Sequence, residues 1–358
     1  MKVLFIVRST LYTVRGGDTI QVIETARQLT KLGIEVDIRQ TQEKINYSVY
    51  DLLHFFNIIR PADIIVHIKR SNKPFVISPI LVDYSGYDKQ HRSGFAGKLF
   101  KWLPAAGIEY VKTIFRVLRR KDRLASRSYL WKGQHRSIKE ILQQTKCVLV
   151  SADEEYRDLV KRYHVGPPCM VVPNGLDCAF FKPTGGIQKE NDLVLCVARI
   201  EGIKNQYNLI KALNNTAFRL LLIGDGAPNQ KKYYLQCKKI AAANISFIPY
   251  LQHAQLKGYY AAAKVHVLPS WFELCGLASL EAAAMGCQVV ITHNGYAETY
   301  FKDDAFYCDP SQPASILAAI EKAALSNGNN GLQNKITGNY SWEQTAEKIL
   351  MAYKKYIL

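Results

Sequence analysis

Short apolar runs alternate along the chain with longer segments in which apolar residues recur every three or four positions. The first pattern is typical of buried parallel strands and the second of amphipathic helices. In the first half, strands are predicted at Val3–Val7, Ile64–Ile68, Phe75–Ile77 and Cys147–Val150. A helix is predicted from about Asp18 to Leu32, with Asp18 as its N-cap.

The second half repeats this alternation. Its predicted strands are Leu193–Val197, Arg219–Ile223, Ile245–Ile248, Val265–Leu268 and Val289–Ile291. Its predicted helices are Gln206–Leu213, Gln230–Ala242, Ala254–Ala262, Leu277–Met285, Pro313–Leu325 and a last one over Ser341–Tyr356. Strands that alternate with helices favour parallel sheets covered by helices on both faces. The stretch from Pro167 to Gly186, rich in Pro and Gly, is interpreted as a linker between two doubly wound α/β domains.

Charge is concentrated in one part of the 358-residue chain, whose net charge is +17. Residues 89–139, here called the basic segment, hold 14 Lys or Arg residues against two acidic ones, with aromatic and aliphatic residues interleaved. This pattern favours a helix lying on an anionic membrane. An amphipathic helix that covers a domain core, with solvated charges, is the alternative. The candidate membrane-contacting residues are Phe100, Trp102, Arg116, Arg119 and Arg120.

Several classes of protein are disfavoured. The eight cysteines form no C-x-x-C pair and no zinc-like spacing, so we expect reduced thiols and no metal site. The first apolar run is too short for a signal peptide, and no run is long enough to cross a bilayer. Neither a G-x-G-x-x-G after the first strand nor a Walker motif is present, and no nucleic-acid recognition module is found. We therefore expect a cytoplasmic enzyme without a nucleic-acid partner.

Two acidic residues, Glu273 and Glu281, flank the predicted start of a helix that Gly276 opens. The free N–H groups at such a start bind anions such as a diphosphate. Glu273 is placed to bind sugar hydroxyls and Glu281 to hold a ribose. Taken alone, the spacing also fits an ordinary strand–loop–helix with two surface carboxylates.

Cations and glycines occur at corresponding places elsewhere. Arg199 and Lys204 follow the first strand of the second half and are placed to neutralise a departing diphosphate. A solvated loop in a basic protein gives the same pattern. Gly16-Gly17 precedes the first helix, where glycine lets the backbone approach a phosphate, and Gly224 closes a later strand.

Together these elements resemble the retaining glycosyltransferases of family four, the glycosyl transferases group 1, which have the GT-B fold. The matching motifs are Glu-x7-Glu (273, 281), Arg-x4-Lys (199, 204), the glycine loop (16, 17), Pro-Asn-Gly-x-Asp (173–177), Gly-x-Gly (224–226) and Tyr-Ser-Trp (340–342). The resemblance implies two Rossmann-like domains facing across a crevice. The first domain is expected at 1–175 and the second at 176–340. A final helix, 341–358, is expected to pack on the first domain.

The resemblance also implies retaining transfer of a hexose from a nucleotide diphosphate sugar of the UDP or GDP type, without a metal or other cofactor. Arg199 and Lys204 would stabilise the diphosphate and Glu273 would orient the sugar, which makes these three the catalytic candidates. The donor-binding candidates are Gly16, Gly17, Gly224, Tyr250, Cys275, Gly276, Leu277 and Glu281.

The acceptor side departs from the family pattern. Many members place a histidine after a first-domain strand, and no histidine stands at the aligned position here. Asp83, His91 and Asn174 are the acceptor-side candidates. The family implies a glycan acceptor, expected to be lipid-linked, in lipopolysaccharide, O-antigen or capsule synthesis on the inner face of the cytoplasmic membrane. The alternatives are a GT-B epimerase, which the Glu-x7-Glu element disfavours, and a catalytically silent GT-B domain that binds a membrane or partner.

Overall fold

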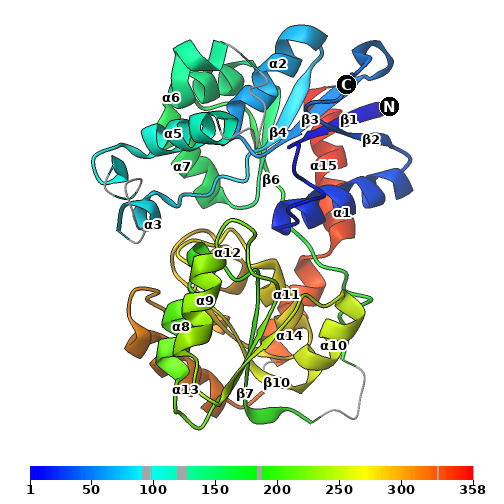
Figure 1. Cartoon of the computed structure of the whole chain (residues 1–358). Coiled ribbons are helices and arrows are strands. Elements are labelled where there is room, and N and C mark those ends of the chain that lie inside the picture. Colours follow the sequence, from blue (N-terminus) through cyan, green and yellow to red (C-terminus); the bar gives the residue numbers. More distant parts are fainter. Residues whose placement is uncertain are drawn as a thin grey trace. The chain divides into compact units, whose positions relative to one another are not determined.

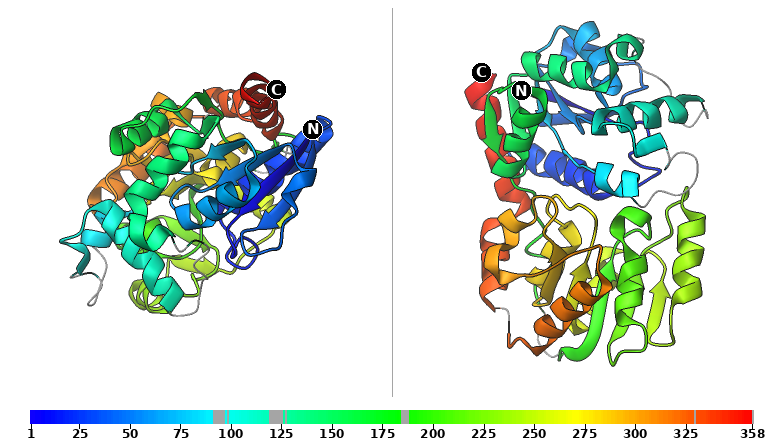
Figure 2. Two further views of the ribbon diagram at one scale, coloured as in Figure 1. Left: turned by 90° about the horizontal axis from the view of Figure 1, so that it is seen from above. Right: turned by 90° about the vertical axis from the view of Figure 1, so that its left-hand side faces the viewer.

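The computed structural model describes residues 1–90, 97, 99–118, 126, 128–183, 188–328 and 330–357. The chain divides into two compact units. Unit 1 comprises Met1–Asn174 and Trp342–Leu358, and unit 2 comprises Gly175–Ser341. Within each unit a single sheet lies between helices (Figures 1 and 2).

Unit 1 contains a parallel sheet of six strands in the order β2-β1-β3-β4-β5-β6. The strands are β1 (Lys2–Val7), β2 (Glu35–Gln40), β3 (Leu52–Phe56), β4 (Phe75–Ser78), β5 (Cys147–Val150) and β6 (Cys169–Val171). The helices are α1 (Gly17–Lys31), α2 (Pro61–Ser71), α3 (Ser85–Gln90), α5 (Ala105–Leu118), α6 (Ser128–Gln144), α7 (Asp153–Tyr163) and α15 (Trp342–Tyr356), with a short 3-10 turn at Tyr47–Val49.

The core of unit 1 lies on both faces of this sheet. Successive side chains of a strand point to opposite faces, so Val3 and Phe5 of β1 pack with α1 and α15, whereas Leu4 and Ile6 pack with α2, α6 and α7. Because both faces are covered, the inner strands are continuous apolar runs. This confirms the expected parallel, helix-covered sheet.

One predicted strand is wrong, because Ile64–Ile68 lies inside helix α2. Pro61 occupies the first helical position, where its missing N–H costs nothing, and Asp63 lies in the first turn. The side of α2 that faces the sheet includes Ile64, Ile65 and Ile68. These apolar residues, spaced for a helix, form a short apolar run that resembles a strand. Strand β2 was missed since it is an edge strand with no fully buried residue.

Helix α1 also begins earlier than predicted. Its first residue is Gly17 and its N-cap is Gly16, so Asp18 lies in the first turn instead of capping the helix. The Asp18 side chain is engaged elsewhere, in an ion pair with Arg8.

Unit 2 contains a second parallel sheet of six strands, in the order β12-β11-β10-β7-β8-β9. The strands are β7 (Glu190–Val197), β8 (Arg219–Ile223), β9 (Ile245–Ile248), β10 (Ala263–Leu268), β11 (Gln288–Thr292) and β12 (Phe306–Cys308). The helices are α8 (Gln206–Leu213), α9 (Lys231–Ile240), α10 (His253–Ala262), α11 (Leu277–Ala284), α12 (Glu298–Phe301), α13 (Pro313–Leu325) and α14 (Asn330–Asn339), with 3-10 turns at Gly202–Lys204 and Lys302–Asp304. The predicted bounds of α8 and α13 are confirmed.

Helix α15 belongs to unit 1, where it packs on α1 and β5. Ala346, Ile349 and Ala352 enter the core, and the Thr345 hydroxyl donates to the carbonyl oxygen of Pro173 at 2.8 Å. In unit 2, the N–H of Leu176 donates to the carbonyl oxygen of Tyr340 at 3.0 Å. Among the described residues, no helix has the length and apolar content needed to cross a bilayer.

A buried polar network fixes α15 to the sheet. The Nδ1 of His54 in β3 lies 2.6 Å from the Tyr353 hydroxyl, and its Nε2 lies 2.9 Å from the Ser78 hydroxyl of β4. Burial lowers the pKa of His54 to about 3, so the ring is neutral at pH 7. Each ring nitrogen therefore has one hydrogen-bond partner.

We predict that Tyr353→Phe destabilises the protein by about 2 kcal/mol, because it leaves a buried ring nitrogen unsatisfied. Chemical unfolding followed by circular dichroism measures the change. Tyr356→Phe is the matched control, since this half-buried tyrosine lies on the same helix outside the network. Equal stability of the two variants would contradict the role of the network.

Candidate functional site

In unit 2, the loops that follow β7 and β8 are joined along their backbones. The N–H of Ile200 donates to the carbonyl oxygen of Asp225 at 2.9 Å, and the N–H of Ala227 donates to that of Ile200 at 3.0 Å. Gly224 has a φ of +143°, and a Cβ there would lie 2.3 Å from the carbonyl oxygen of Ala198. Only glycine permits this approach, which places the Gly-x-Gly turn beside Arg199.

Arg199 is held by a buried carboxylate that sequence analysis missed. Its Nη2 and Nε donate to Oε1 of Glu201 at 2.7 and 3.2 Å. The Gln206 side chain donates to the Arg199 carbonyl oxygen and accepts from the Glu201 N–H. Glu201 is only 5% exposed, whereas the Arg199 side chain retains 32%. Proximity to the Arg-x4-Lys pair is the only signal in the sequence for this residue.

Lys204 and Glu273 are brought together, although sequence analysis assigned them separate tasks. The Nζ of Lys204 lies 2.5 Å from Oε1 of Glu273. The loops that carry them are tied by the Trp271 N–H, which donates to the carbonyl oxygen of Ile203 at 3.0 Å. Asn205 strengthens this tie, since its side-chain amide donates to the Pro269 carbonyl oxygen at 3.1 Å.

The backbone of Glu273 is clamped by the loop after β11. Its N–H donates to the Asn294 carbonyl oxygen at 2.9 Å, and its carbonyl oxygen accepts the Tyr296 N–H at 2.8 Å. A Cβ on Gly295 would lie 1.9 Å from the Glu273 carbonyl oxygen, so Gly295 must be glycine. The role of Gly295 was not predicted, because its only signal in the sequence is the His-Asn-Gly turn after a predicted strand.

Helix α11 begins directly beyond Glu273. Gly276 is its N-cap with a φ of +65°, and its carbonyl oxygen accepts the N–H groups of Ser279 and Leu280. The first N–H groups of the helix, beginning at Leu277, have no acceptor within it and carry the positive end of the helix dipole. Cys275 is buried before this start. These residues form an anion-binding geometry next to the Lys204–Glu273 pair.

Glu281 lies on α11 in a buried setting. Its Oε2 accepts a hydrogen bond from the Tyr260 hydroxyl at 2.9 Å, and its Oε1 lies 3.6 Å from Nε2 of His253. Burial raises the pKa of Glu281 to about 7, although the Tyr260 bond opposes this change. Tyr260 and His253 were not predicted. The ring of Tyr250 is exposed after β9, and its N–H donates to Asp225.

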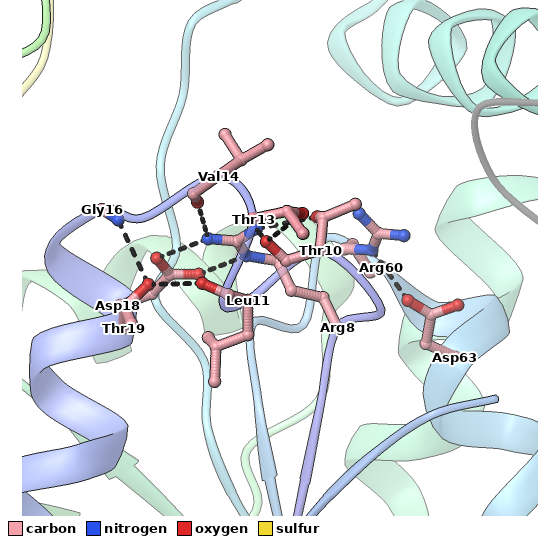
Figure 3. Close-up of polar contacts among 10 residues, drawn as sticks. All are labelled: Arg8, Thr10, Leu11, Thr13, Val14, Gly16, Asp18, Thr19, Arg60 and Asp63. Carbon is pink, nitrogen blue, oxygen red and sulfur yellow. Dashed lines mark hydrogen bonds and ion pairs between the residues drawn. The ribbon is translucent and has the colours of Figure 1, made fainter. Parts of the chain in front are cut away.

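In unit 1, the loop after β1 runs from Arg8 to Gly16, the N-cap of α1, and Gly17 and Asp18 follow in the first turn of that helix (Figure 3). The Arg8 guanidinium forms two bonds to Asp18, at 2.6 and 3.0 Å, and donates to the carbonyl oxygens of Thr10 and Val14. The N–H of Gly16 donates to the Thr19 hydroxyl at 3.1 Å. Arg8, which sequence analysis did not select, therefore sets the conformation of the glycine loop.

A second ion pair lies at the end of β3. Nε of Arg60 is 2.7 Å from Oδ2 of Asp63, in the first turn of α2 (Figure 3). Both side chains are largely buried. The pair joins the loop after β3 to the start of that helix.

The acceptor-side candidates that the structure describes lie in different segments of unit 1. Asp83 lies 2.7 Å from Nη2 of Arg162; burial opposes its ionisation, but bonds from Ser85 and Arg162 lower its pKa below the usual value. Asn174 is buried at the end of the long segment of unit 1. His91 lies outside the described residues.

The basic segment differs from prediction at one residue. Phe100 is 2% exposed, so its ring belongs to the interior of unit 1, whereas Trp102 is 89% exposed. Arg116 lies on α5, and its side chain is outside the described part, as are Arg119 and Arg120. Among the described residues, no three His, Cys, Asp or Glu side chains group as a metal site.

Residues 179–344 match the family model described as Glycosyl transferases group 1. A D-inositol 3-phosphate glycosyltransferase of Acidothermus cellulolyticus is 23% identical over 390 aligned residues, which cover 95% of this chain and 85% of that protein. A protein of the same name from Xylanimonas cellulosilytica is 24% identical, over 94% of this chain and 91% of that protein.

Solved structures share the fold. Sucrose-phosphate synthase from Thermosynechococcus elongatus has a TM-score of 0.76 at 16% identity, over 99% of both chains. Anabaena HepE, in complex with UDP and glucose, has a TM-score of 0.67 at 16% identity, also over 99% of both chains. The chain therefore has the GT-B fold of two Rossmann-like domains, and the comparisons support a group 1 glycosyltransferase.

Proposed function

We propose that this protein is a retaining, family-four hexosyltransferase that uses a nucleotide diphosphate sugar. The observation that carries the proposal is the arrangement in unit 2, where Arg199, Lys204 and Glu273 lie on tied loops beside the start of α11. Two cations and a helix start suit a diphosphate, and an adjacent carboxylate suits sugar hydroxyls.

In the proposed reaction, the bond between the anomeric carbon and the diphosphate oxygen breaks, and negative charge develops on that oxygen. Arg199 and Lys204 stabilise this charge, with the first N–H groups of α11 assisting. The acceptor hydroxyl attacks from the side on which the leaving group departs, so the configuration is retained. A phosphate oxygen of the leaving group takes the hydroxyl proton, so no side chain is needed as the base.

The carboxylates Glu201 and Glu273 serve to position the cations. Each forms an ion pair with one of them, so the guanidinium and the ammonium are held before the donor binds. Such preorganisation avoids the cost of reorienting charged groups during the reaction. Glu273 can also accept hydrogen bonds from the sugar, since only one of its oxygens pairs with Lys204 at this distance.

The donor is proposed to be of the UDP or GDP type. In support, HepE, which shares the fold, has been solved with UDP and glucose. Glu281 would hold the ribose, and Tyr250 and Gly224 would contact the nucleotide.

We propose a lipid-linked glycan as the acceptor, in lipopolysaccharide, O-antigen or capsule synthesis, with the protein peripheral on the inner face of the cytoplasmic membrane. The net charge of +17 supports an anionic surface or an anionic acceptor. The relatives are named for inositol 3-phosphate, which is also anionic. A catalytically silent binding module is the alternative, and the intact cation–carboxylate pairs disfavour it.

Nucleotide binding gives the first test. We expect one of UDP, GDP, ADP and CMP to raise the melting temperature, since a ligand at 1,000 times its dissociation constant adds about 4 kcal/mol to stability. Arg199→Ala/Lys204→Ala should abolish the shift. Lys232→Ala/Lys239→Ala removes two exposed lysines of α9 and is the charge-matched control. No shift with any nucleotide would favour the silent module.

Variants of the two carboxylates test catalysis. Glu273→Gln should lower kcat about 100-fold or more, because Lys204 loses its ion-pair partner and the sugar hydroxyls lose a charged acceptor. Glu201→Gln should lower kcat while largely preserving KM, because it frees Arg199 without touching the sugar. Release of nucleoside diphosphate from the donor measures both. Near-normal turnover by Glu273→Gln would remove that residue from the mechanism.

The buried Glu281 predicts a pH dependence. Its pKa of about 7 means that the carboxylate is increasingly protonated below neutral pH. An ionised carboxylate is the better acceptor for ribose hydroxyls, so nucleotide affinity should fall as the pH decreases from 8 to about 5.5. Calorimetric titration with the nucleotide measures this change. Glu281→Gln should remove most of it; an unchanged slope in that variant would assign the dependence to another group.

A further inference from the structure

Two tryptophans of unit 1 are almost fully exposed. Trp102, before α5, and Trp131, in the first turn of α6, are each 89% exposed, and Leu325, at 83%, comes next among the described residues. Phe115 and Leu130 are exposed as well, at 44% and 43%. A group of large exposed apolar side chains, unlike a single one, marks an interaction surface.

These residues belong to one substructure. Helices α5 and α6 are in contact, and the Tyr110 hydroxyl of α5 donates to the carbonyl oxygen of Leu130 at 3.0 Å. The rings of Tyr110 and Tyr129 lie 5.4 Å apart. From Ala105 to Tyr110 the helix advances only about 7.5 Å. Trp131 therefore follows directly the residues of α6 that contact α5, and Trp102 lies just before α5 begins.

Helix α5 buries little of its apolar surface. Ile108 is the one buried side chain among those described on it, whereas Val111, Ile114 and Val117 are half-buried. The inner side is fixed by Phe100 and by Lys112, which pairs with Asp88 of α3. The segment is thus anchored to unit 1 on one side and has unburied apolar surface on the other.

The sequence of the basic segment, to which these residues belong, is strongly positive in charge. The basic segment carries 14 Lys or Arg residues and two acidic ones. Within it, Lys101 is adjacent to Trp102, and Arg136 lies five residues after Trp131, beyond the break in α6 at Gly133 (φ +67°); both cations are exposed. Tryptophan prefers the headgroup level of a bilayer, and exposed cations are attracted by anionic lipids.

We propose that Trp102, Phe115, Leu130 and Trp131 form an insertion surface by which unit 1 binds an anionic membrane, with Lys101 and Arg136 contacting lipid headgroups. This inference deepens the proposed function and rests on it for the lipid-linked acceptor. The insertion surface does not include Phe100, which is buried, and it includes Leu130 and Trp131 of α6. The positive charge disfavours a second copy of this basic chain as the occupant.

Cosedimentation with vesicles tests the proposal. The full-length protein should bind vesicles of phosphatidylglycerol and phosphatidylcholine, and bind phosphatidylcholine alone more weakly. Trp102→Ser/Trp131→Ser should lower the partition coefficient about tenfold or more, since both aromatic side chains are lost from the interface. Lys101→Glu/Arg136→Glu should weaken binding to the anionic vesicles, and added salt should do the same to the wild type.

Leu235→Ser/Leu325→Ser is the matched control, because it removes two exposed apolar side chains of unit 2. It should bind vesicles like the wild type. The proposal would be overturned if the wild type did not bind anionic vesicles, or if the Trp102→Ser/Trp131→Ser variant bound them as the wild type does. If the wild type self-associates but does not bind vesicles, and the Trp102→Ser/Trp131→Ser variant no longer self-associates, the surface contacts a second copy and the proposal is overturned.

The nucleotide shift, measured on the same samples without lipid, separates this proposal from the proposed function. A variant that retains the shift but loses vesicle binding supports the insertion surface. Vesicle binding without any nucleotide shift would support the surface and defeat the transferase proposal.

Discussion

The structure of each unit depends on the burial of parallel strands on both faces. Because each parallel connection must cross back over the sheet, in most cases through a helix, the strands of a sheet end at one edge and the following loops gather there. In unit 2 this constraint brings the loops after β7, β8, β10 and β11 together, although 96 positions separate Arg199 from Gly295 in the sequence. Backbone hydrogen bonds between these loops, with glycine at the closest approaches, then fix the site.

Within that edge the charges are paired before any ligand arrives. Arg199 forms an ion pair with Glu201, and Lys204 forms one with Glu273. Both carboxylates are buried, and Lys204 is largely buried. A cation held by a carboxylate keeps its position but has part of its charge balanced, so a diphosphate must compete with the carboxylates. Such an arrangement suits transient stabilisation of a leaving group better than permanent retention of the product.

Unit 1 uses ion pairs for a different purpose. Arg8 binds Asp18 and the carbonyl oxygens of its own loop, and thereby fixes the backbone that carries Gly16 and Gly17. Arg162 forms an ion pair with Asp83, so this carboxylate is less available to an acceptor than the sequence suggested. The exposed tryptophans before α5 and in α6 give the same unit apolar side chains in contact with water, within the most basic part of its sequence.

The sequence by itself determined the alternation of strands and helices, the bounds of α8 and α13, and the motifs at Glu273, Glu281, Arg199 and Lys204, because these depend on local periodicity and spacing. Tertiary structure decided the rest. Ile64–Ile68 is helical because one side of α2 packs on the sheet, and Phe100 is buried while Trp102 is not. The pairing of Lys204 with Glu273, the clamp at Gly295 and the bond from Tyr260 to Glu281 join residues far apart in the chain, so no local pattern encodes them.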